Sequence, residues 1–209
     1  MENIKKLYEN HHAIAREEDF SIMKNERAKY FCNLIGTGKK ILDIGCRDGA
    51  LTHFFIKGND VTGIDIDEVA LKRAAEKGIN VKVMDIYGDW SVLLDQKFDV
   101  IVAGEVLEHL YYPDRIVTKI YEHLSQGGIF IGSVPNAFSL KNRFRLLFGN
   151  KKNTPLEDPT HINHFGVKDI IRLLKDFKET KVGGLGRYVF LAKTFPKLLS
   201  FDLVFHAKK

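Results

Sequence analysis

The chain has 209 residues, of which 44% are hydrophobic and 28% are charged, and its formal net charge is +5. This composition is typical of a globular domain with a sizeable core. We expect no stable membrane insertion, because no apolar run approaches the roughly 20 residues that cross a bilayer. Two cysteines provide neither a disulfide framework nor a zinc cluster. The positive charges are scattered, which argues against a nucleic-acid partner.

Residues 1–35 predict an N-terminal helical cap over the functional site. The first residues are charged and lack an apolar signal core, so we expect a cytoplasmic location. Gly36 and Gly38 end the helical pattern. One apolar helical face would hold Ile22, Ala28, Phe31, Leu34 and Ile35.

A strand, a glycine turn and a helix follow at residues 41–56. This unit presents backbone N–H groups at the carboxyl end of a strand, where phosphates and nucleotides bind. Gly45 allows a ligand to approach closely, and Gly49 allows strand and helix to pack. Asp43 precedes the turn, and a buried carboxylate is costly unless it holds the turn or a ligand. The spacing is not the dinucleotide fingerprint, because Arg47 stands where a middle glycine is needed.

Strands and helices then alternate, which predicts a parallel sheet with helices on both faces. Asp67 is a plausible N-cap, and Pro113 suits the first turn of a helix. The predicted strands are residues 60–65, 79–84, 98–103 and 128–134, and the predicted helices are 68–77, 87–95 and 113–124.

The C-terminal part departs from this alternation. Residues 136–165 form an inserted segment that we expect to be a substrate lid, and it includes a basic, aromatic helix at 140–148. The apolar spacing of this helix predicts packing onto the domain, while a dimer face or a membrane-surface helix stays open. A further helix is predicted at 167–177, and two last strands at 178–182 and 203–207.

Two motifs carry a resemblance to a known family. Ile-Leu-Asp-Ile-Gly-Cys-Arg-Asp-Gly, residues 41–49, resembles motif I of class I S-adenosylmethionine-dependent methyltransferases, apart from Arg47. Phe-Asp-Val-Ile-Val-Ala-Gly-Glu-Val-Leu-Glu-His, residues 98–109, resembles motif IV of one branch. That branch contains ubiquinone-biosynthesis O-methyltransferases, methionine-biosynthesis-associated proteins and small-molecule methyltransferases of polysaccharide clusters. Four motifs occur in the family's order between residues 25 and 180.

The resemblance implies one methyltransferase domain over residues 1–209 with the Rossmann-like class I fold. Its sheet has seven mostly parallel strands, an antiparallel last strand and helices on both faces. The implied cofactor is S-adenosylmethionine, which leaves as S-adenosylhomocysteine.

Cofactor contacts are expected at the ends of the first four strands. Asp65 lies about 20 residues beyond the turn, where a carboxylate accepts hydrogen bonds from ribose hydroxyls. The resemblance places Asp85 against the adenine amino group. Arg47 either pairs with the cofactor carboxylate, points to solvent or weakens the pocket. The predicted cofactor-binding residues are Asp43, Gly45, Cys46, Arg47, Gly49, Asp65, Ile66, Asp85, Ile86 and Glu105.

Two histidine clusters are candidates for catalysis. His109 suits deprotonation of a hydroxyl, with Glu108 orienting it. A second interpretation is that Glu105, Glu108 and His109 together hold a divalent cation, and these ligands suit magnesium better than structural zinc. A third is that the segment only anchors a loop. We assign no metal ligand. His161 is the second candidate base, and the idea requires the two clusters to converge.

We therefore expect methyl transfer to a small-molecule acceptor, most simply a hydroxyl oxygen of a sugar, a phenol or a related metabolite. One alternative is an accessory protein that binds S-adenosylmethionine and regulates a partner enzyme. The other is a nicotinamide-dependent oxidoreductase, against which the missing third glycine argues. A homodimer is left open. Asn163 and His164 are candidates for binding polar groups of the substrate.

Overall fold

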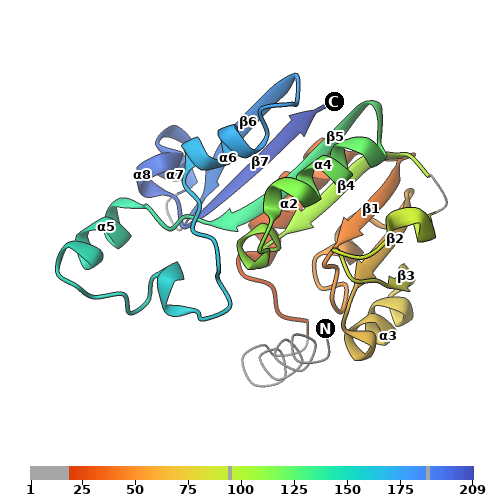
Figure 1. Ribbon diagram of the computed structural model, residues 1–209, viewed down its shortest axis with the longest axis horizontal. Helices are drawn as coiled ribbons and strands as arrows, with labels where there is room; N and C mark the ends of the chain where they lie inside the picture. The colour runs from red at the N-terminus through yellow and green to blue at the C-terminus, as the bar shows by residue number, and fades with distance from the viewer. Residues whose placement is uncertain (1–18, 94–95, 187–188) are drawn as a thin grey trace. The chain divides into compact units, whose positions relative to one another are not determined.

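The computed structural model describes residues 19–93, 96–186 and 189–209. The chain divides into two compact units, residues 1–100 and 101–209 (Figure 1). The seven strands follow the order β3-β2-β1-β4-β5-β7-β6. This order confirms the predicted seven-stranded sheet. The expectation of one methyltransferase domain over the whole chain stays a prediction.

Residues 1–100 hold three parallel strands. Lys40 pairs with Asp60 and Ile44 with Ile64, so β1 and β2 end together. The helix α3 contacts β2 and β3. The elements are α2 (Lys24–Ile35), β1 (Lys40–Ile44), η1 (Thr52–Phe55), β2 (Asp60–Asp65), α3 (Glu68–Glu76), β3 (Asn80–Val83) and η2 (Trp90–Leu93); β4 (Phe98–Gly104) runs on into residues 101–209.

Two segments of this unit that were predicted as α-helices form only short 3₁₀ helices. Residues 50–56 contain only the four-residue 3₁₀ helix η1, and residues 87–93 only η2. Thr52 and the aromatic side chains after it are poor helix formers, and Gly58, with a φ of 78°, prevents the helix from continuing. Residues 94 and 95 lie outside the described part.

The predicted N-terminal cap is only partly described, since residues 1–18 lie outside the described residues. Its helix α2 buries Ala28, Phe31 and Ile35 as expected, whereas Ile22 is exposed. Arg27 occupies the buried position that the apolar pattern left open, and its Nη1 donates a hydrogen bond to Ser21 Oγ over 3.1 Å. Arg27, with its guanidinium hydrogen-bonded, therefore completes the buried face of α2.

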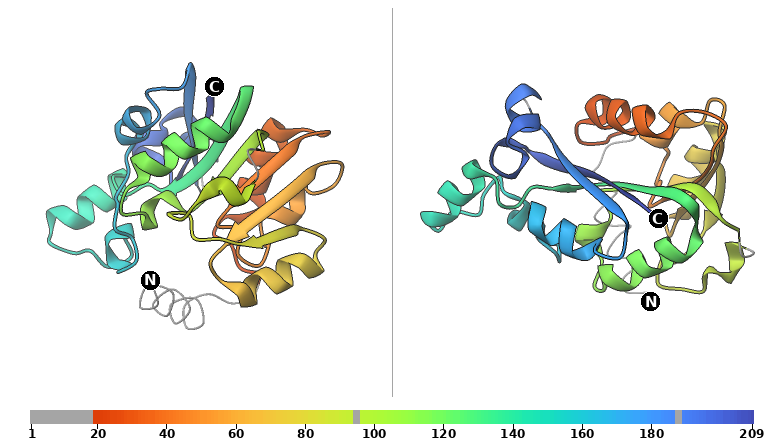
Figure 2. Two further views of the ribbon diagram at one scale, coloured as in Figure 1. Left: turned by 45° about the vertical axis from the view of Figure 1, so that its right-hand side comes forward. Right: turned by 90° about the horizontal axis from the view of Figure 1, so that it is seen from above.

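In residues 101–209, β7 is antiparallel to both of its neighbours, β5 and β6. This confirms the antiparallel last strand. The helices α4 and α6 lie on one face of these strands, and α7 and α8 on the other (Figure 2). The elements are η3 (Leu107–His109), α4 (Pro113–His123), β5 (Leu124–Pro135), α5 (Leu140–Leu147), η4 (Pro155–Glu157), α6 (Val167–Leu173), β6 (Glu179–Leu185), α7 (Val189–Thr194), α8 (Pro196–Leu199) and β7 (Asp202–Lys208).

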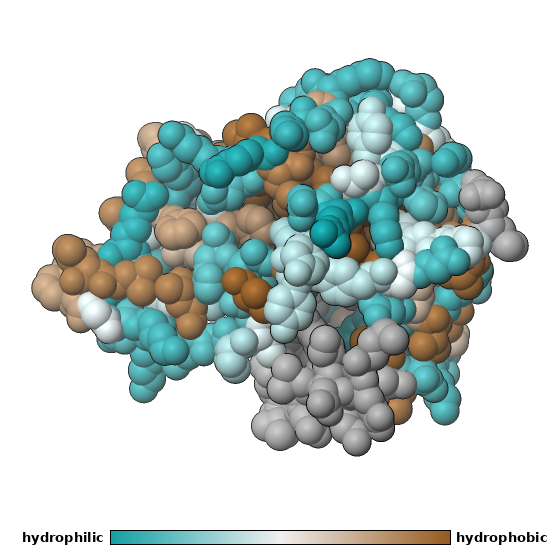
Figure 3. All heavy atoms as spheres, in the orientation of Figure 1, coloured by the Kyte–Doolittle hydropathy of each residue, from teal (hydrophilic) through white to brown (hydrophobic). Residues whose placement is uncertain are grey.

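The expected packing of the 140–148 helix is wrong. Its apolar side chains face outward, with Phe144 64% and Leu147 76% exposed (Figure 3). The helix instead buries Asn142, whose Nδ2 donates a 2.9 Å hydrogen bond to the carbonyl oxygen of Asn136. A polar side chain with a specific backbone partner thus decides which face turns inward.

Candidate functional site

The glycine turn after β1 is built from three left-handed residues. Gly45, Arg47 and Gly49 have φ values of 71°, 49° and 73°. The φ of Gly49 is strained for a residue with a side chain, and a Cβ there would also lie 2.5 Å from Ile79 Cδ1, so glycine is strongly favoured at this position. Gly45 N and Cys46 N both donate to the carbonyl oxygen of Ile64, over 2.8 and 3.2 Å. The expectation of backbone N–H groups kept for a ligand is therefore wrong for these two residues, because the turn folds back onto β2.

Asp65 ties the turn to the end of β2. Its Oδ2 accepts a 2.9 Å hydrogen bond from Arg47 N, and its Oδ1 accepts one of 2.9 Å from Asp67 N. Burial raises the pKa of the Asp65 carboxyl, whereas these N–H donors lower it. A carboxylate accepts about four hydrogen bonds, so acceptor capacity remains beyond these two.

Asp43 is buried under the turn. Its Oδ2 accepts a 2.6 Å hydrogen bond from Thr52 Oγ1. Burial raises the pKa of Asp43 to about 7, although the Thr52 hydroxyl acts in the opposite direction and the charge of Asp65 adds to the rise. Asp43 thus holds η1 against β1. Burial also raises the pKa of the Cys46 thiol, which lowers its thiolate fraction. Its predicted contact with the cofactor stays a prediction.

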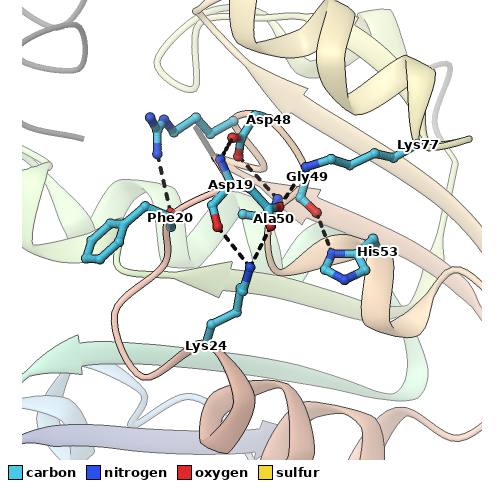
Figure 4. A network of polar contacts seen from close by, with 9 residues as sticks. Asp19, Phe20, Lys24, Asp48, Gly49, Ala50, His53 and Lys77 are labelled. Atoms are coloured by element: carbon cyan, nitrogen blue, oxygen red, sulfur yellow. Dashed lines mark hydrogen bonds and ion pairs between the residues drawn. The ribbon is translucent and has the colours of Figure 1, made fainter. Parts of the chain in front are cut away.

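The Arg47 side chain reaches the N-terminal segment. Its Nη1 donates a 3.4 Å hydrogen bond to the Phe20 carbonyl oxygen (Figure 4). Asp19 N donates to Asp48 Oδ2 over 2.7 Å, so the same segment is fastened to the turn twice. These contacts favour the interpretation in which only the backbone of Arg47 shapes the turn.

Asp19 adds an ion-pair network that the sequence did not suggest. Its carboxylate lies 2.7 Å from Lys24 Nζ and 2.9 Å from Lys77 Nζ (Figure 4). Hydrogen bonds from the two ammonium groups lower the pKa of Asp19 to about 2. Pairs this exposed contribute little stability each. No local pattern marks Asp19, because Lys77 lies 58 residues away in the sequence.

Asp85 follows β3 at the same edge as Asp65. Met84 N donates to the Asp65 carbonyl oxygen over 2.9 Å, which brings the ends of β2 and β3 together. Asp85 Oδ1 accepts a 2.8 Å hydrogen bond from Tyr87 N and so forms an Asx turn. Ile66 and Ile86 are half-buried beside these carboxylates in the sequence. Their predicted contacts with adenine stay predictions.

The two histidine clusters meet in residues 101–209. The rings of His109, on η3, and His161, in the loop before α6, lie 5.0 Å apart between centroids. Glu108 is buried, and its Oε1 lies 3.9 Å from His109 Nε2. Ligand atoms of these three residues all lie within 4.8 Å of one another.

Both histidine rings place Nδ1 at a backbone carbonyl. His109 Nδ1 lies 2.9 Å from the Thr160 oxygen, and His161 Nδ1 lies 2.9 Å from the Pro155 oxygen. A carbonyl oxygen only accepts hydrogen bonds, so each Nδ1 carries a proton. In its neutral form each ring has its lone pair on Nε2, which is the atom of a general base.

Asn163 fastens the histidine loop to η3. Its backbone N donates to the Glu108 carbonyl oxygen over 2.9 Å, and its Nδ2 donates to the carbonyl oxygen of Leu110. This use of the amide favours a structural role over the predicted substrate contact. His164 Nε2 is buried without a hydrogen-bond partner among the described residues, and burial together with the charge of His161 lowers the His164 pKa.

Glu105 adopts a strained backbone at the end of β4. Its φ is 58°, an uncommon value for a residue with a side chain. Its N–H donates a 3.0 Å hydrogen bond to the Ser133 carbonyl oxygen on β5. Strain of this kind concentrates at functional sites. Its predicted contact with the cofactor stays a prediction.

Sequence reasoning missed Asp158. Its Oδ2 lies 3.6 Å from His161 Nε2, and its Oδ1 accepts hydrogen bonds from Thr160 N and Oγ1, over 2.9 and 2.7 Å. Asp-Pro-Thr is a typical Asx-turn sequence, so this turn was a signal that could have located the residue.

A family model described as a methyltransferase domain matches residues 15–178. The chain belongs to this family. The predicted class I fold and the predicted class of S-adenosylmethionine-dependent methyltransferase are thereby confirmed. In the part of the chain that the structure describes, no helix combines the length and apolarity needed to cross a membrane.

Curated relatives match about half of the chain. Ubiquinone biosynthesis O-methyltransferase of Pasteurella multocida (strain Pm70) is 36% identical over 115 residues, which are 48% of this chain and 48% of the relative. The protein of the same name from Pseudomonas putida (strain W619) is 34% identical over 113 residues, 49% of each chain. The chain thus spans about half the length of the curated relatives it matches.

Solved structures match over nearly the whole chain. A SAM-dependent methyltransferase from Archaeoglobus fulgidus has a TM-score of 0.68 at 17% identity, covering 97% of this chain and 99% of its own. The plantazolicin methyltransferase BpumL in complex with SAH has a TM-score of 0.65 at 20% identity, covering 98% of this chain and 89% of its own. At these identities the likeness shows the fold.

Proposed function

We propose that this methyltransferase moves the methyl group of S-adenosylmethionine to a hydroxyl oxygen of a small-molecule acceptor. The observation that carries this proposal is the pair of histidines whose Nδ1–H groups are held by carbonyl oxygens while Nε2 of His109 lies beside the buried Glu108. Nε2 in this tautomer accepts a proton from a hydroxyl. The O-methyltransferase names of the curated relatives point in the same direction.

The glycine turn and the strand ends around it suit the cofactor. Asp65 is held by two backbone N–H donors and has acceptor capacity left for two ribose hydroxyls. Asp85 follows the neighbouring strand and suits an amino donor such as that of adenine. Asp43 and Gly49 maintain the turn.

The chemical step needs little beyond alignment and proton removal. An oxygen lone pair of the acceptor forms the new O–C bond to the methyl group. The C–S bond breaks, and its electron pair stays on sulfur, so the sulfonium becomes the neutral thioether of S-adenosylhomocysteine. The hydroxyl proton passes to His109 Nε2 and then to water, a transfer that contributes about 10²–10⁴-fold in typical enzymes.

Three further assignments belong to this proposal. Residues 136–165 act as a substrate lid, with Phe144 and Leu147 exposed on α5 in the structure. The protein works in the cytoplasm, and a homodimer is its expected assembly if the apolar face of α5 meets a second copy.

Calorimetric titration with S-adenosylhomocysteine, with NADH in a parallel run, tests the cofactor. We expect micromolar binding of the first ligand alone. Incubation with S-adenosylmethionine and a panel of phenols and hydroxylated sugars, read by mass spectrometry, tests the acceptor class. Binding without turnover, together with a copurifying enzyme, would favour the accessory-protein alternative. Binding of NADH alone would overturn the assignment.

A further inference from the structure

We propose that residues 19–23 form a strap over the glycine turn, that Asp19 latches this strap, and that its opening sets the rates at which the cofactor enters and leaves. Strap, turn and latch all belong to residues 1–100 (Figure 4). The latch is argued from the observed contacts alone, whereas its effect on the cofactor rests on the proposed function.

The strap is fastened to the turn by two hydrogen bonds. Asp19 N donates to Asp48 Oδ2 over 2.7 Å, and Arg47 Nη1 donates to the Phe20 carbonyl oxygen over 3.4 Å. Asp48 is buried, and its other carboxylate oxygen accepts a 3.2 Å hydrogen bond from Ala50 N. The strap therefore supplies a donor to a buried carboxylate of the turn, and opening removes that donor.

The Asp19 carboxylate joins the strap to two helices. Lys24 Nζ, at the start of α2, lies 2.7 Å from Asp19 Oδ2 and also donates a 2.9 Å hydrogen bond to the Asp19 carbonyl oxygen. Lys77 Nζ, at the C-cap of α3, lies 2.9 Å from Asp19 Oδ1. One carboxylate thus holds the strap against both α2 and α3, and the loss of its charge weakens both ion pairs at once.

The strap lies at the edge of the sheet that the proposed function assigns to the cofactor. The turn follows β1 directly, and open α/β sheets bind ligands at the carboxyl ends of their strands. Arg47, whose side chain contacts the strap, also donates its backbone N–H to Asp65, the residue proposed to bind the ribose. A closed strap in this position obstructs the path of a ligand to the turn.

Buried apolar surface contributes little to the closed strap. Phe20 is 46% and Ile22 36% exposed, so neither side chain is anchored in the core. Segments with few buried apolar contacts open at a low cost in free energy. The side chain of Asp19 is itself 53% exposed, and ion pairs of this kind contribute little each. The closed strap is therefore held by a small number of weak polar contacts.

Backbone strain opposes these contacts. Asp19 and Met23, at the two ends of the strap, have φ values of 57° and 48°, which are unfavourable for residues with a side chain. Met23 is also the N-cap of α2, and its side chain makes no capping hydrogen bond. Opening allows both residues to return to ordinary backbone angles. Strain and latch thus act in opposite directions, so a small change in either shifts the strap between open and closed.

The latch is expected to respond to salt and not to pH. Hydrogen bonds from Lys24 and Lys77 lower the pKa of Asp19 to about 2, so its carboxylate stays charged at any physiological pH. Dissolved salt screens exposed charges, because the Debye length falls from about 30 Å at 0.01 M to about 3 Å at 1 M ionic strength. High salt should therefore open the strap.

The first test needs no cofactor. Hydrogen exchange read by NMR follows the residue 19 N–H, which Asp48 holds in the closed strap. Asp19→Asn removes the charge and keeps the backbone, because asparagine adopts left-handed angles more readily than most residues. We expect the protection factor of this N–H to fall about three- to tenfold, since two exposed ion pairs are weakened. Lys77→Gln removes one pair and should lower it about two- to threefold.

The second test measures S-adenosylhomocysteine on the immobilised full chain by surface plasmon resonance. In Asp19→Asn the association rate and the release rate should rise by the same factor as the opening. Kd should stay within about twofold, because opening that is favoured equally in the free and the bound chain shifts no binding equilibrium. Raising KCl from about 0.05 M to about 1 M should speed both rates in the wild-type chain and much less in the variant.

Glu179→Gln is the matched control. Glu179 and Lys181 form an exposed ion pair of 2.7 Å on β6, which is as short as the Asp19–Lys24 pair but lies outside the strap and the turn. Its loss should leave the protection of residue 19 and both rates unchanged. Thermal unfolding of each variant shows that it folds.

Three results would overturn parts of this proposal separately. Equal protection of the residue 19 N–H in the wild-type chain and Asp19→Asn would overturn the latch. Faster opening with unchanged rates, or a raised Kd with only the release rate altered, would overturn the gate and leave Asp19 a structural residue. A wild-type chain that binds no S-adenosylhomocysteine would overturn the proposed function and the gate together, while hydrogen exchange decides the latch independently.

Discussion

The glycine turn of residues 1–100 and the Glu108–His109–His161 cluster of residues 101–209 are assembled in different ways. In the turn, the bonded partners lie close in sequence, 9 residues apart for Asp43 and Thr52 and 18 for Arg47 and Asp65. In the cluster, His109 and its partner Thr160 are 51 residues apart. A site of the first kind forms with its strands, whereas the second also requires a long loop to close.

The two regions also differ in what their polar atoms do. The turn carboxylates accept hydrogen bonds from backbone N–H groups and from the Thr52 hydroxyl, so they stabilise a shape. In the cluster, a carbonyl oxygen accepts from Nδ1 of each histidine, and Nε2 lies beside a carboxylate, Glu108 for His109 and Asp158 for His161. The difference supports our proposal that the turn serves as the scaffold for cofactor binding and the cluster as the place of proton transfer.

His109→Gln should have the largest effect and should separate the two regions. We expect turnover to fall by about 10²–10⁴-fold, because the group that accepts or activates the proton is lost. S-adenosylhomocysteine affinity, measured by calorimetry, should not change. An equal loss of cofactor affinity would break the division between scaffold and chemistry, and His123→Gln should retain full turnover.

Asp65→Asn should weaken S-adenosylhomocysteine binding by about ten- to a hundredfold. The amide keeps one acceptor oxygen but loses the charge that strengthens hydrogen bonds from the ribose hydroxyls and from Arg47 N. Asp67→Asn is the matched control, since asparagine caps α3 as well as aspartate does. Unchanged affinity in Asp65→Asn would show that this carboxylate only shapes the turn.

Asp43→Asn tests the buried carboxylate through pH. The folded pKa of about 7 lies above the ordinary value of 3.8, so between these two pH values the folded chain keeps a proton that the unfolded chain has lost. Raising the pH through this window therefore lowers the free energy of unfolding, by up to a few kcal/mol.

Urea unfolding at pH 5 and pH 8 measures this difference. The wild-type chain should lose more stability between the two pH values than Asp43→Asn does, while other groups that titrate affect both proteins alike. The side-chain amide oxygen that this substitution introduces still accepts from the Thr52 hydroxyl, so the packing under the turn is retained. The same pH dependence in both proteins would contradict the assignment.

Arg47→Gly should have the smallest effect. Glycine adopts the φ of 49° without strain, which stabilises the fold by about 1 kcal/mol, while the 3.4 Å hydrogen bond to Phe20 is lost. S-adenosylhomocysteine affinity should change by no more than about threefold, because the hydrogen bond that is lost is weak. Arg47→Ala also removes the guanidinium but keeps the backbone strain. The difference between Arg47→Gly and Arg47→Ala therefore measures the effect of that strain alone. A tenfold loss of affinity in both would show that the guanidinium binds the cofactor.

Much of the fold was predictable because its signals are local. Asp67 caps α3 and Pro113 begins α4 as expected, since capping and proline effects depend on a few neighbouring residues. Alternating strands and helices predicted the parallel part of the sheet. The type of η1 was not predictable in this way, because apolar spacing alone does not distinguish one turn from a full helix.

The sequence by itself therefore determined the order of strands and helices, the glycine turn with Asp65 at the next strand end, and the family. Only the tertiary structure decided that His109 and His161 meet, which Nε2 atoms keep their lone pairs, where the Arg47 side chain goes and which face of α5 is exposed. The physical reason is range. Turns and caps depend on neighbours along the chain, whereas these features depend on backbone carbonyls and side chains that only loop closure and packing bring into contact.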